Sequence, residues 1–343
     1  MEHSEIKASG GVSPGHRTKP DIDARVGNPS RIPFTALVVA ALVLGVGAAV
    51  LISPVAALGV AAAGFHFPFP RIFDRTVIIT LLLAMLLFAR ALNLKALIVR
   101  GFNYARGDNF RGNALDPRGG TYRRALASAG GGLVLALVAM VILFAIASAM
   151  GAGGRDAVAA VVVRAARYAL AAVVIAIIEE SFFRAFLLGG MTRDFGRQGA
   201  LVVSAAIYSL THIVRAPAHY YLASYHPGAG LHNLALSAER LIHPVAALPT
   251  IVGLFLLGVV LGEAFLLTGT VYFSIGLHAG FVIGAKSWPV LGDHGARMPL
   301  WLAGTGPVPL IGGAAAWLMA LIVMAILPLL LGRERAEHTL DAE

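Results

Sequence analysis

Eight long apolar segments constrain this chain more than any other feature of its sequence. A transmembrane helix needs roughly 20 predominantly apolar residues to cross the hydrocarbon core of a bilayer. The segments are approximately 33–60, 72–97, 125–150, 168–189, 199–215, 246–267, 269–285 and 307–331. They predict an all-α fold, namely a polytopic membrane helix bundle with about eight transmembrane helices.

The composition agrees with a bilayer as the surrounding medium. Of the 343 residues, 58% are hydrophobic and 13% are charged, whereas soluble domains are about 45–50% apolar and about 25% charged. The net charge of +9 comes without a basic surface interleaved with aromatic residues, so a nucleic-acid partner is not expected. The absence of cysteine excludes disulfides and thiolate catalysis.

The end of the second segment and the loop that follows it predict the orientation. Their basic residues far outnumber Asp108 and Asp116, and short loops rich in arginine and lysine stay in the cytoplasm. These basic residues are Arg90, Lys95, Arg100, Arg106, Arg111, Arg118, Arg123 and Arg124. We therefore expect both termini to be cytoplasmic, although Arg155, Arg164 and Arg167 lie on the side that this rule does not favour.

The two ends of the chain are polar. Residues 1–32 contain three prolines and precede a long apolar segment rather than a short one, so we interpret them as a disordered cytoplasmic tail and not as a signal peptide. Residues 332–343 form a second cytoplasmic tail. The membrane helical domain would then occupy residues 33–331.

Residues 216–245 form an outer loop in this scheme and differ from the other loops. They contain several aromatic and imidazole side chains: His219, Tyr220, Tyr221, Tyr225, His226, His232 and His243. A metal or ligand site is conceivable here. A solvated loop with interfacial tyrosines is the favoured interpretation, because the histidines lack a compact ligand spacing.

The fourth apolar segment carries two adjacent carboxylates, Glu179 and Glu180, followed by Arg184. Each charged side chain costs roughly 2.5–3.5 kcal/mol at the centre of a membrane helix, so such residues usually have a function. Glu180 and Arg184 are four residues apart and share a helix face, which predicts an ion pair. Glu179 is rotated by about 100° from Glu180, and we expect it to face the bundle interior as a general acid or base.

Two further segments each carry one histidine, His212 in the fifth and His278 in the seventh. A single membrane histidine is often no more than an interhelical hydrogen-bonding group. Two of them together with a Glu-Glu pair, on three separate segments, favour a reactive site. The alternative is an ion-pair network that only fixes helix packing, and it accounts for Glu180 and Arg184 better than for Glu179.

These residues resemble a known family. The stretch from Glu179 to Arg184, with Glu179, Glu180, Phe183 and Arg184 as its matching residues, is similar to the EExxxR motif of the CPBP intramembrane proteases. These are the type II CAAX prenyl endopeptidases and their bacterial relatives. The resemblance covers about residues 125–290, which would be the protease core.

The histidines match that family in order and spacing. Tyr208 and His212 resemble its FxxxH motif, with tyrosine in place of phenylalanine, and the turn-like Thr268-Gly269-Thr270 precedes His278 as in its third region. One position departs from the pattern, because Val282 stands where the family often has an asparagine that helps to hold the oxyanion. Oxyanion stabilisation would then come from His278, from backbone, or from a hydroxyl such as Ser274.

The resemblance implies an intramembrane endopeptidase whose substrate is a membrane-associated protein or peptide. Glu179 would be the general base on a water molecule, His212 would orient this water, and His278 would stabilise the oxyanion. Glu180 and Arg184 would hold the helix and tune Glu179. The implied location is a multi-pass position in the bacterial inner (cell) membrane.

Three questions stay open at this stage. Zinc is possible as a cofactor, with Glu179, His212 and His278 as its ligands, but a metal-free glutamate mechanism is favoured because Arg184 disfavours a nearby cation. A proton-coupled transporter could use the same carboxylates as a proton relay, although no internal repeat supports it. A non-catalytic membrane scaffold or immunity-type protein could also keep this polar cluster.

Overall fold

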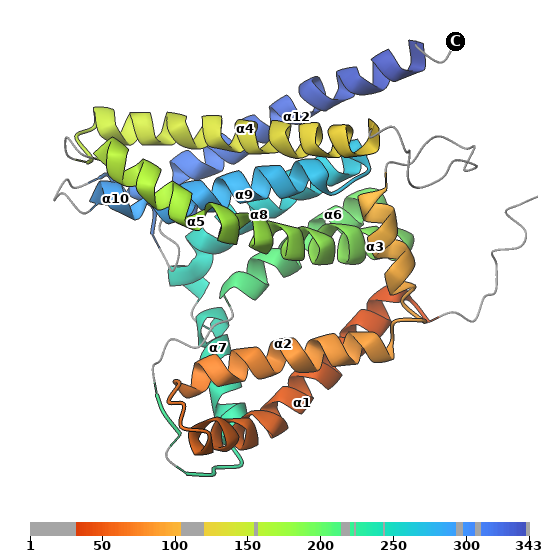
Figure 1. The fold of residues 1–343 in the computed structure, drawn as a ribbon, viewed down its shortest axis with the longest axis vertical. Coiled ribbons are helices and arrows are strands. Elements are labelled where there is room, and N and C mark those ends of the chain that lie inside the picture. The colour runs from red at the N-terminus through yellow and green to blue at the C-terminus, as the bar shows by residue number, and fades with distance from the viewer. Residues whose placement is uncertain are drawn as a thin grey trace, which may run out of the picture. The chain divides into compact units, whose positions relative to one another are not determined.

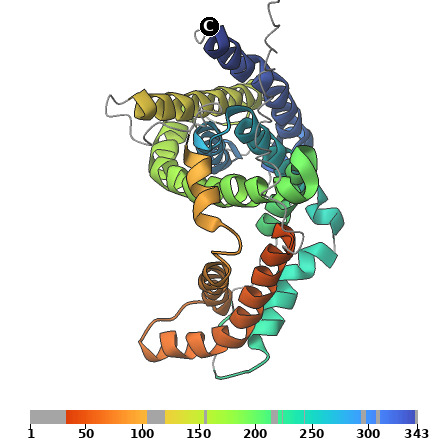
Figure 2. The same ribbon diagram turned by 90° about the vertical axis from the view of Figure 1, so that its right-hand side faces the viewer.

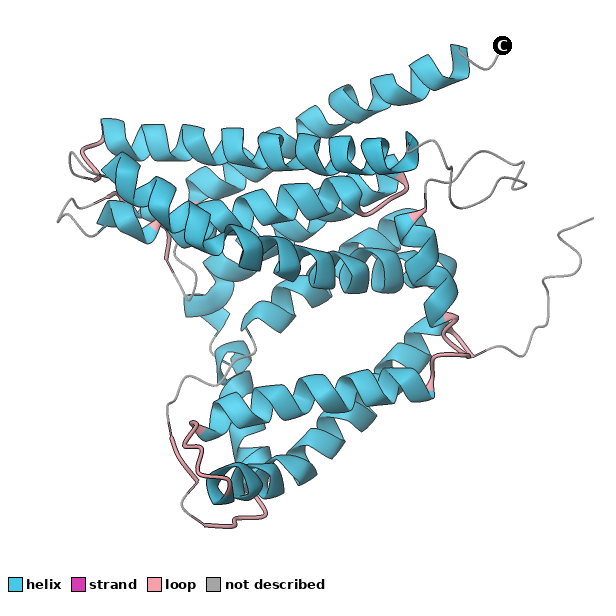
Figure 3. Cartoon of the chain, in the orientation of Figure 1, coloured by secondary structure: helices cyan, strands magenta, loops and turns pink. Residues whose placement is uncertain are grey.

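The structure is a computed structural model, and it describes residues 32–103, 120–153, 157–213, 220–222, 224–242, 244–292, 298–305 and 310–340. Within these residues all regular elements are helices and no strand occurs (Figure 3), which confirms the all-α prediction. The tail predicted at the N-terminus lies outside the described residues except for Ile32, and so does most of the arginine-rich loop that follows the second segment.

The helices of the structure (Figure 1) include at least one at each apolar segment of the sequence. They are α1 (Phe34–Ala62), α2 (Phe69–Leu87), α3 (Leu94–Phe102), α4 (Gly120–Ala149), α5 (Ala157–Glu180), α6 (Gly189–Ile213), α7 (Ala229–Ile242), α8 (Pro244–Thr268), α9 (Tyr272–Ser287), α10 (Pro289–Gly292), α11 (Leu300–Ala303) and α12 (Ala314–Leu340). A π-helical segment, η2 (Ser181–Leu188), joins α5 to α6, and a short 3₁₀ turn, η3 (Leu310–Gly312), precedes α12.

Five helical stretches of the described chain are long and apolar enough to cross a membrane. They are Phe34–Ala62, Tyr122–Ala149, Val158–Ile213, Val245–Thr268 and Ala314–Leu331. The third stretch contains two of the predicted segments, and the predicted segments 72–97 and 269–285 correspond to shorter helices. The chain is therefore an integral membrane protein with several spans, and its orientation stays a prediction.

Gly196 reverses the chain in the middle of the longest apolar stretch. Its backbone adopts φ = 67°, a left-handed conformation that glycine tolerates and that breaks the helix. The second half of α6 consequently packs against η2. Glu179 lies 17 residues before Gly196 and His212 lies 16 residues after it, so the two antiparallel arms bring these side chains to the same level.

Helix α9 packs directly against the backbone of α4. A side chain at Gly276 would collide with the backbone of Ala129, and a side chain at Gly132 would collide with the carbonyl of Phe273. Small residues allow such close helix approach in lipid, where packing replaces the hydrophobic driving force. Because α9 carries His278, this interface helps to set the position of that imidazole.

The sequence had suggested a loop for the whole histidine- and tyrosine-rich region, residues 216–245, but part of this region is helical. Residues Ala229–Ile242 form α7, which packs beside α1 (Figure 2). Pro54 in α1 has no N–H and therefore frees the carbonyl of Val50, and Gly230 of α7 packs closely on that carbonyl. Hydropathy does not reveal this contact between Gly230 and the Val50 carbonyl, because it depends on how α7 and α1 pack together.

A buried polar contact also anchors this region. The Tyr220 hydroxyl donates to Oδ1 of Asn233 at 2.9 Å, and the Asn233 side chain is fully buried. His226 and His232 are exposed, while His219 and His243 lie outside the described residues. These contacts assign the described part of residues 216–245 to packing against α1 and α2.

Candidate active site

A fully buried ion pair lies at the junction of α5 and η2. Nε of Arg184 is 3.2 Å from Oε2 of Glu180, and neither side chain is exposed to solvent. The other carboxylate oxygen, Oε1, accepts a hydrogen bond from Nδ1 of His278 at 2.9 Å. Glu180 thus joins α5, η2 and α9, and the predicted pairing of Glu180 with Arg184 is present in the structure.

The second carboxylate faces a different set of groups. Oε2 of Glu179 is 3.5 Å from Nε2 of His212 and 3.8 Å from Nε2 of His278. The Glu179 side chain is 26% exposed and that of His212 is 30% exposed. The structure therefore separates the two glutamates as expected, with one buried against the arginine and the other open toward both histidines.

The change from α-helix to π-helix occurs directly after these glutamates. Single π-helical turns leave backbone carbonyls with poorer partners and occur often at functional sites. Two serine hydroxyls donate to carbonyls at this junction, Ser181 to Ile177 at 2.5 Å and Ser204 of α6 to Phe183 at 3.2 Å. In an apolar surrounding these bonds replace the water that would otherwise satisfy the carbonyls.

The hydrogen bonds of the imidazoles define which nitrogen of each ring is protonated. Nδ1 of His212 lies 2.8 Å from the Tyr208 carbonyl, and a carbonyl only accepts, so Nδ1 carries the proton. Nδ1 of His278 likewise donates to the carboxylate of Glu180. In the neutral form, each ring therefore presents the lone pair of Nε2 toward Glu179.

Three acceptor atoms consequently converge on one small volume: Oε2 of Glu179 and the two Nε2 atoms. Oε2 of Glu179 is buried and has no hydrogen-bond partner among the described residues. Buried acceptors without a donor are costly, by about 1–3 kcal/mol each. The arrangement therefore suits a small group that brings hydrogens or positive charge to these atoms.

The turn predicted from Thr268-Gly269-Thr270 connects α8 to α9. Gly269 has φ = 70°, and the Thr268 hydroxyl contacts the carbonyl of Thr270 at 2.9 Å. The N–H of Val271 then donates to the carbonyl of Gly101 at the end of α3. This turn starts α9 at the position that brings His278 to Glu180.

The suggested zinc ligands, Glu179, His212 and His278, match zinc chemistry in type. One carboxylate and two imidazoles with oriented Nδ1 atoms are a common donor set. Among the described residues, however, no three histidine, aspartate or glutamate side chains are arranged as a group that could hold a metal ion. We therefore derive no step through a metal.

The departure at Val282 leaves an apolar side chain at that position. Val282 packs against a buried cluster that contains Ala172, Ala176 and Ala279, and the hydroxyl of the fully buried Ser274 donates to the Val271 carbonyl at 3.2 Å. Val282 therefore offers no donor, and the hydroxyl of Ser274, which the sequence had suggested as an oxyanion contact, is already paired.

Tyr208 is the site residue to which the sequence assigned no role. Its ring centroid lies 4.4 Å from that of His212 and 6.2 Å from that of His278. The guanidinium carbon of Arg184 lies 5.1 Å from the same ring. The available signal was a tyrosine four residues before His212, which places both rings on one helix face.

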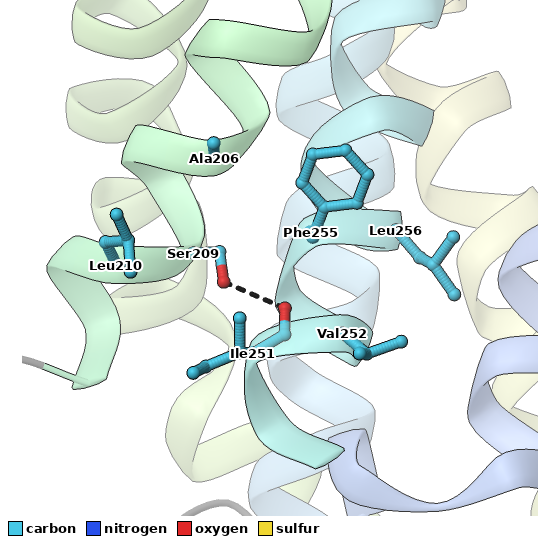
Figure 4. A pocket seen from close by; sticks show the side chains of 7 residues that line it. All are labelled: Ala206, Ser209, Leu210, Ile251, Val252, Phe255 and Leu256. Carbon is cyan, nitrogen blue, oxygen red and sulfur yellow. Dashed lines mark hydrogen bonds between the residues drawn. The ribbon is translucent and has the colours of Figure 1, made fainter. Parts of the chain in front are cut away.

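A groove near the site is apolar and distinct from it. It has a volume of about 240 Å³ and lies between α6 and α8, where Ala206, Leu210, Phe255 and Leu256 line it (Figure 4). Ser209 also lines it, but its hydroxyl donates to the Ile251 carbonyl at 2.8 Å. None of the predicted catalytic side chains lines this groove.

The fold and the site together define a class of protein, an integral membrane helix bundle with an intramembrane carboxylate–histidine centre. Residues 161–283 match the family model of the type II CAAX prenyl endopeptidases, Rce1-like. The matched segment contains Glu179, Glu180, Arg184, His212 and His278. The resemblance noted from the motifs is thereby confirmed, and it supports a CAAX-type intramembrane endopeptidase in general. No curated protein and no solved structure was found to match the chain.

Proposed function

We propose that this protein hydrolyses a peptide bond of a membrane-associated protein or peptide, with Glu179 as the general base. The observation that carries the proposal is the convergence of the Glu179 carboxylate with Nε2 of His212 and His278 at 3.5 and 3.8 Å. A water molecule has two hydrogens to donate to acceptors in this arrangement, at hydrogen-bond lengths of about 2.8 Å.

The reaction then proceeds in two steps. The water oxygen attacks the carbonyl carbon of the peptide bond while one of its protons moves to Glu179, and the carbonyl oxygen becomes an oxyanion. The tetrahedral intermediate collapses with cleavage of the C–N bond, and the proton held by Glu179 passes to the leaving nitrogen. His212 orients the water, because the Tyr208 carbonyl fixes its Nδ1–H and directs Nε2 toward Glu179.

The buried residues would act by positioning and charge. Glu180 accepts from Nδ1 of His278 and so orients this ring with Nε2 toward Glu179. A protonated His278 would donate from Nε2 to the oxyanion. Arg184 pairs with Glu180 at 3.2 Å and compensates its charge.

The proposed location is the cell membrane. The site residues belong to a helical stretch, residues 158–213, that is long and apolar enough to span a bilayer, and to α9 packed beside it. A substrate anchored in the same bilayer would reach Glu179 and His212 through their exposed sides. We therefore propose a membrane-associated protein or peptide as the partner of this site.

The test is cleavage of a peptide library by the purified full-length protein in detergent, with Glu179→Gln prepared in parallel. Cleavage by the parent and its loss in the variant would support the peptidase. Equal product formation by both proteins would reject Glu179 as the base. A proton-coupled transporter would instead show proton-dependent uptake in vesicles without any cleavage.

A further inference from the structure

Peptide hydrolysis creates an oxyanion, which hydrogen-bond donors at the site stabilise. In its neutral form His278 presents a lone pair at Nε2, because Nδ1–H is committed to Glu180. The hydroxyl of Ser274 is bonded to backbone, and Val282 is apolar. The side chain of Arg184 is fully buried, with Nε against Glu180 and with Nη1 and Nη2 lacking a hydrogen-bond partner among the described residues. A donor that does not depend on a protonated His278 would therefore assist the oxyanion.

Tyr208 lies beside both histidines of this site. Its ring lies against the ring of His212 at 4.4 Å and near that of His278 at 6.2 Å. Its backbone carbonyl accepts from Thr211 and His212, and its hydroxyl has no hydrogen-bond partner among the described residues. The residue is nevertheless only 1% exposed, and a buried phenol usually has a hydrogen-bond partner.

Charged residues of the site surround Tyr208. The charges of Glu179, Glu180 and Arg184 all act on its hydroxyl, which places the residue within the same electrostatic centre. The guanidinium carbon of Arg184 lies 5.1 Å from the ring centroid, within the range of a cation–π contact.

We propose that the Tyr208 hydroxyl donates a hydrogen bond to the tetrahedral oxyanion and is a further catalytic residue of this site. The inference rests on the proposed peptidase function. The hydroxyl keeps its proton throughout, so the proton balance through Glu179 is unchanged. The hydroxyl also supplies a donor that does not require a protonated His278. Val282 cannot supply one, because its side chain is apolar.

The decisive variant is Tyr208→Phe, because it removes one hydroxyl and leaves the ring contacts with both histidines. Loss of a single oxyanion donor lowers kcat by about 10²–10³-fold. We expect kcat to fall in this range with KM nearly unchanged, since the interaction forms only in the transition state. The substrate is an internally quenched peptide that the parent protein cleaves in the library.

Tyr168→Phe is the matched control. Tyr168 lies on α5, the helix that carries Glu179, and it is 36% exposed, so its removal should leave kcat and KM at the parent values. Tyr208→Phe with at least half of the parent kcat would overturn the inference and leave the peptidase proposal intact. Equal cleavage by the parent and Glu179→Gln would overturn the peptidase proposal, and the Tyr208 inference with it.

A second pair of variants covers the case in which Tyr208→Phe melts at a lower temperature than the parent. 4-Aminophenylalanine and 4-methylphenylalanine at position 208 fill nearly the same space, but the amino group alone donates a hydrogen bond. If the hydroxyl acts as a donor, the amino variant should be at least tenfold faster than the methyl variant. Equal rates for the two would assign Tyr208 a packing role only.

Discussion

Replacing Glu179 by glutamine separates catalysis from folding. The substitution keeps the shape of the side chain and supplies an amide N–H₂ opposite two Nε2 lone pairs at 3.5 and 3.8 Å. A buried oxygen without a donor partner is thereby replaced by a group that can donate. We expect the free energy of unfolding to stay equal or to rise by up to about 1 kcal/mol. This value is the lower end of the cost of one unsatisfied buried group, and it applies here because the side chain is partly exposed.

Catalysis should respond in the opposite direction. Removing a general base costs a factor of about 10²–10⁴ in rate, which corresponds to roughly 3–5 kcal/mol of transition-state stabilisation. His212→Ala should cause a comparable loss. The double variant should lose little more than either single variant, because residues that act as one unit are not additive.

The assay measures kcat/KM with a quenched peptide and the melting temperature of the same protein preparation. Glu263→Gln on α8 is the matched control, since its side chain is 22% exposed and lies outside the site. It should keep the parent rate. Retained hydrolysis in Glu179→Gln would refute the mechanism, and loss of folding in this variant would support a packing role for the glutamate pair.

Three further predictions concern stability and metal dependence. Arg184→Ala should destabilise the protein by about 3–5 kcal/mol, because it leaves the buried carboxylate of Glu180 without its cation. The control Arg197→Ala removes a partly exposed pair with 3.9 Å separation and should cost less than about 1 kcal/mol. Equal melting temperatures of the two variants would show that Glu180 has another partner. Gly132→Ala should destabilise the protein by about 1–3 kcal/mol, because the new side chain collides with α9. Gly130 has open space around it, so Gly130→Ala should be neutral or stabilise the protein by up to about 1 kcal/mol. A lower melting temperature for Gly130→Ala than for Gly132→Ala would contradict the described α4–α9 packing. Treatment with a metal chelator should leave kcat/KM unchanged if the base acts on water alone, and a loss that zinc restores would replace the metal-free proposal.

Much of this protein follows from the sequence alone. Apolar segments must become helices in a bilayer, because a helix satisfies its own backbone hydrogen bonds where no water is present, so the helix positions followed from hydropathy. The cost of a charge in an apolar helix also singled out Glu179, Glu180 and Arg184 as residues that need partners. Their spacing of four residues was sufficient to predict the pairing of Glu180 with Arg184.

Other features depend on how the helices meet, which local patterns do not encode. Residues 229–242 form a helix that packs on α1, with Gly230 close to the carbonyl of Val50, whereas the sequence had suggested a loop there. The partner of His278 was likewise unpredictable, because it lies 98 residues away. Only the reversal at Gly196 and the close approach of α4 and α9 bring Glu179, His212, His278 and the Tyr208 ring together, since distances between helices are set by side-chain packing and not by spacing along one helix.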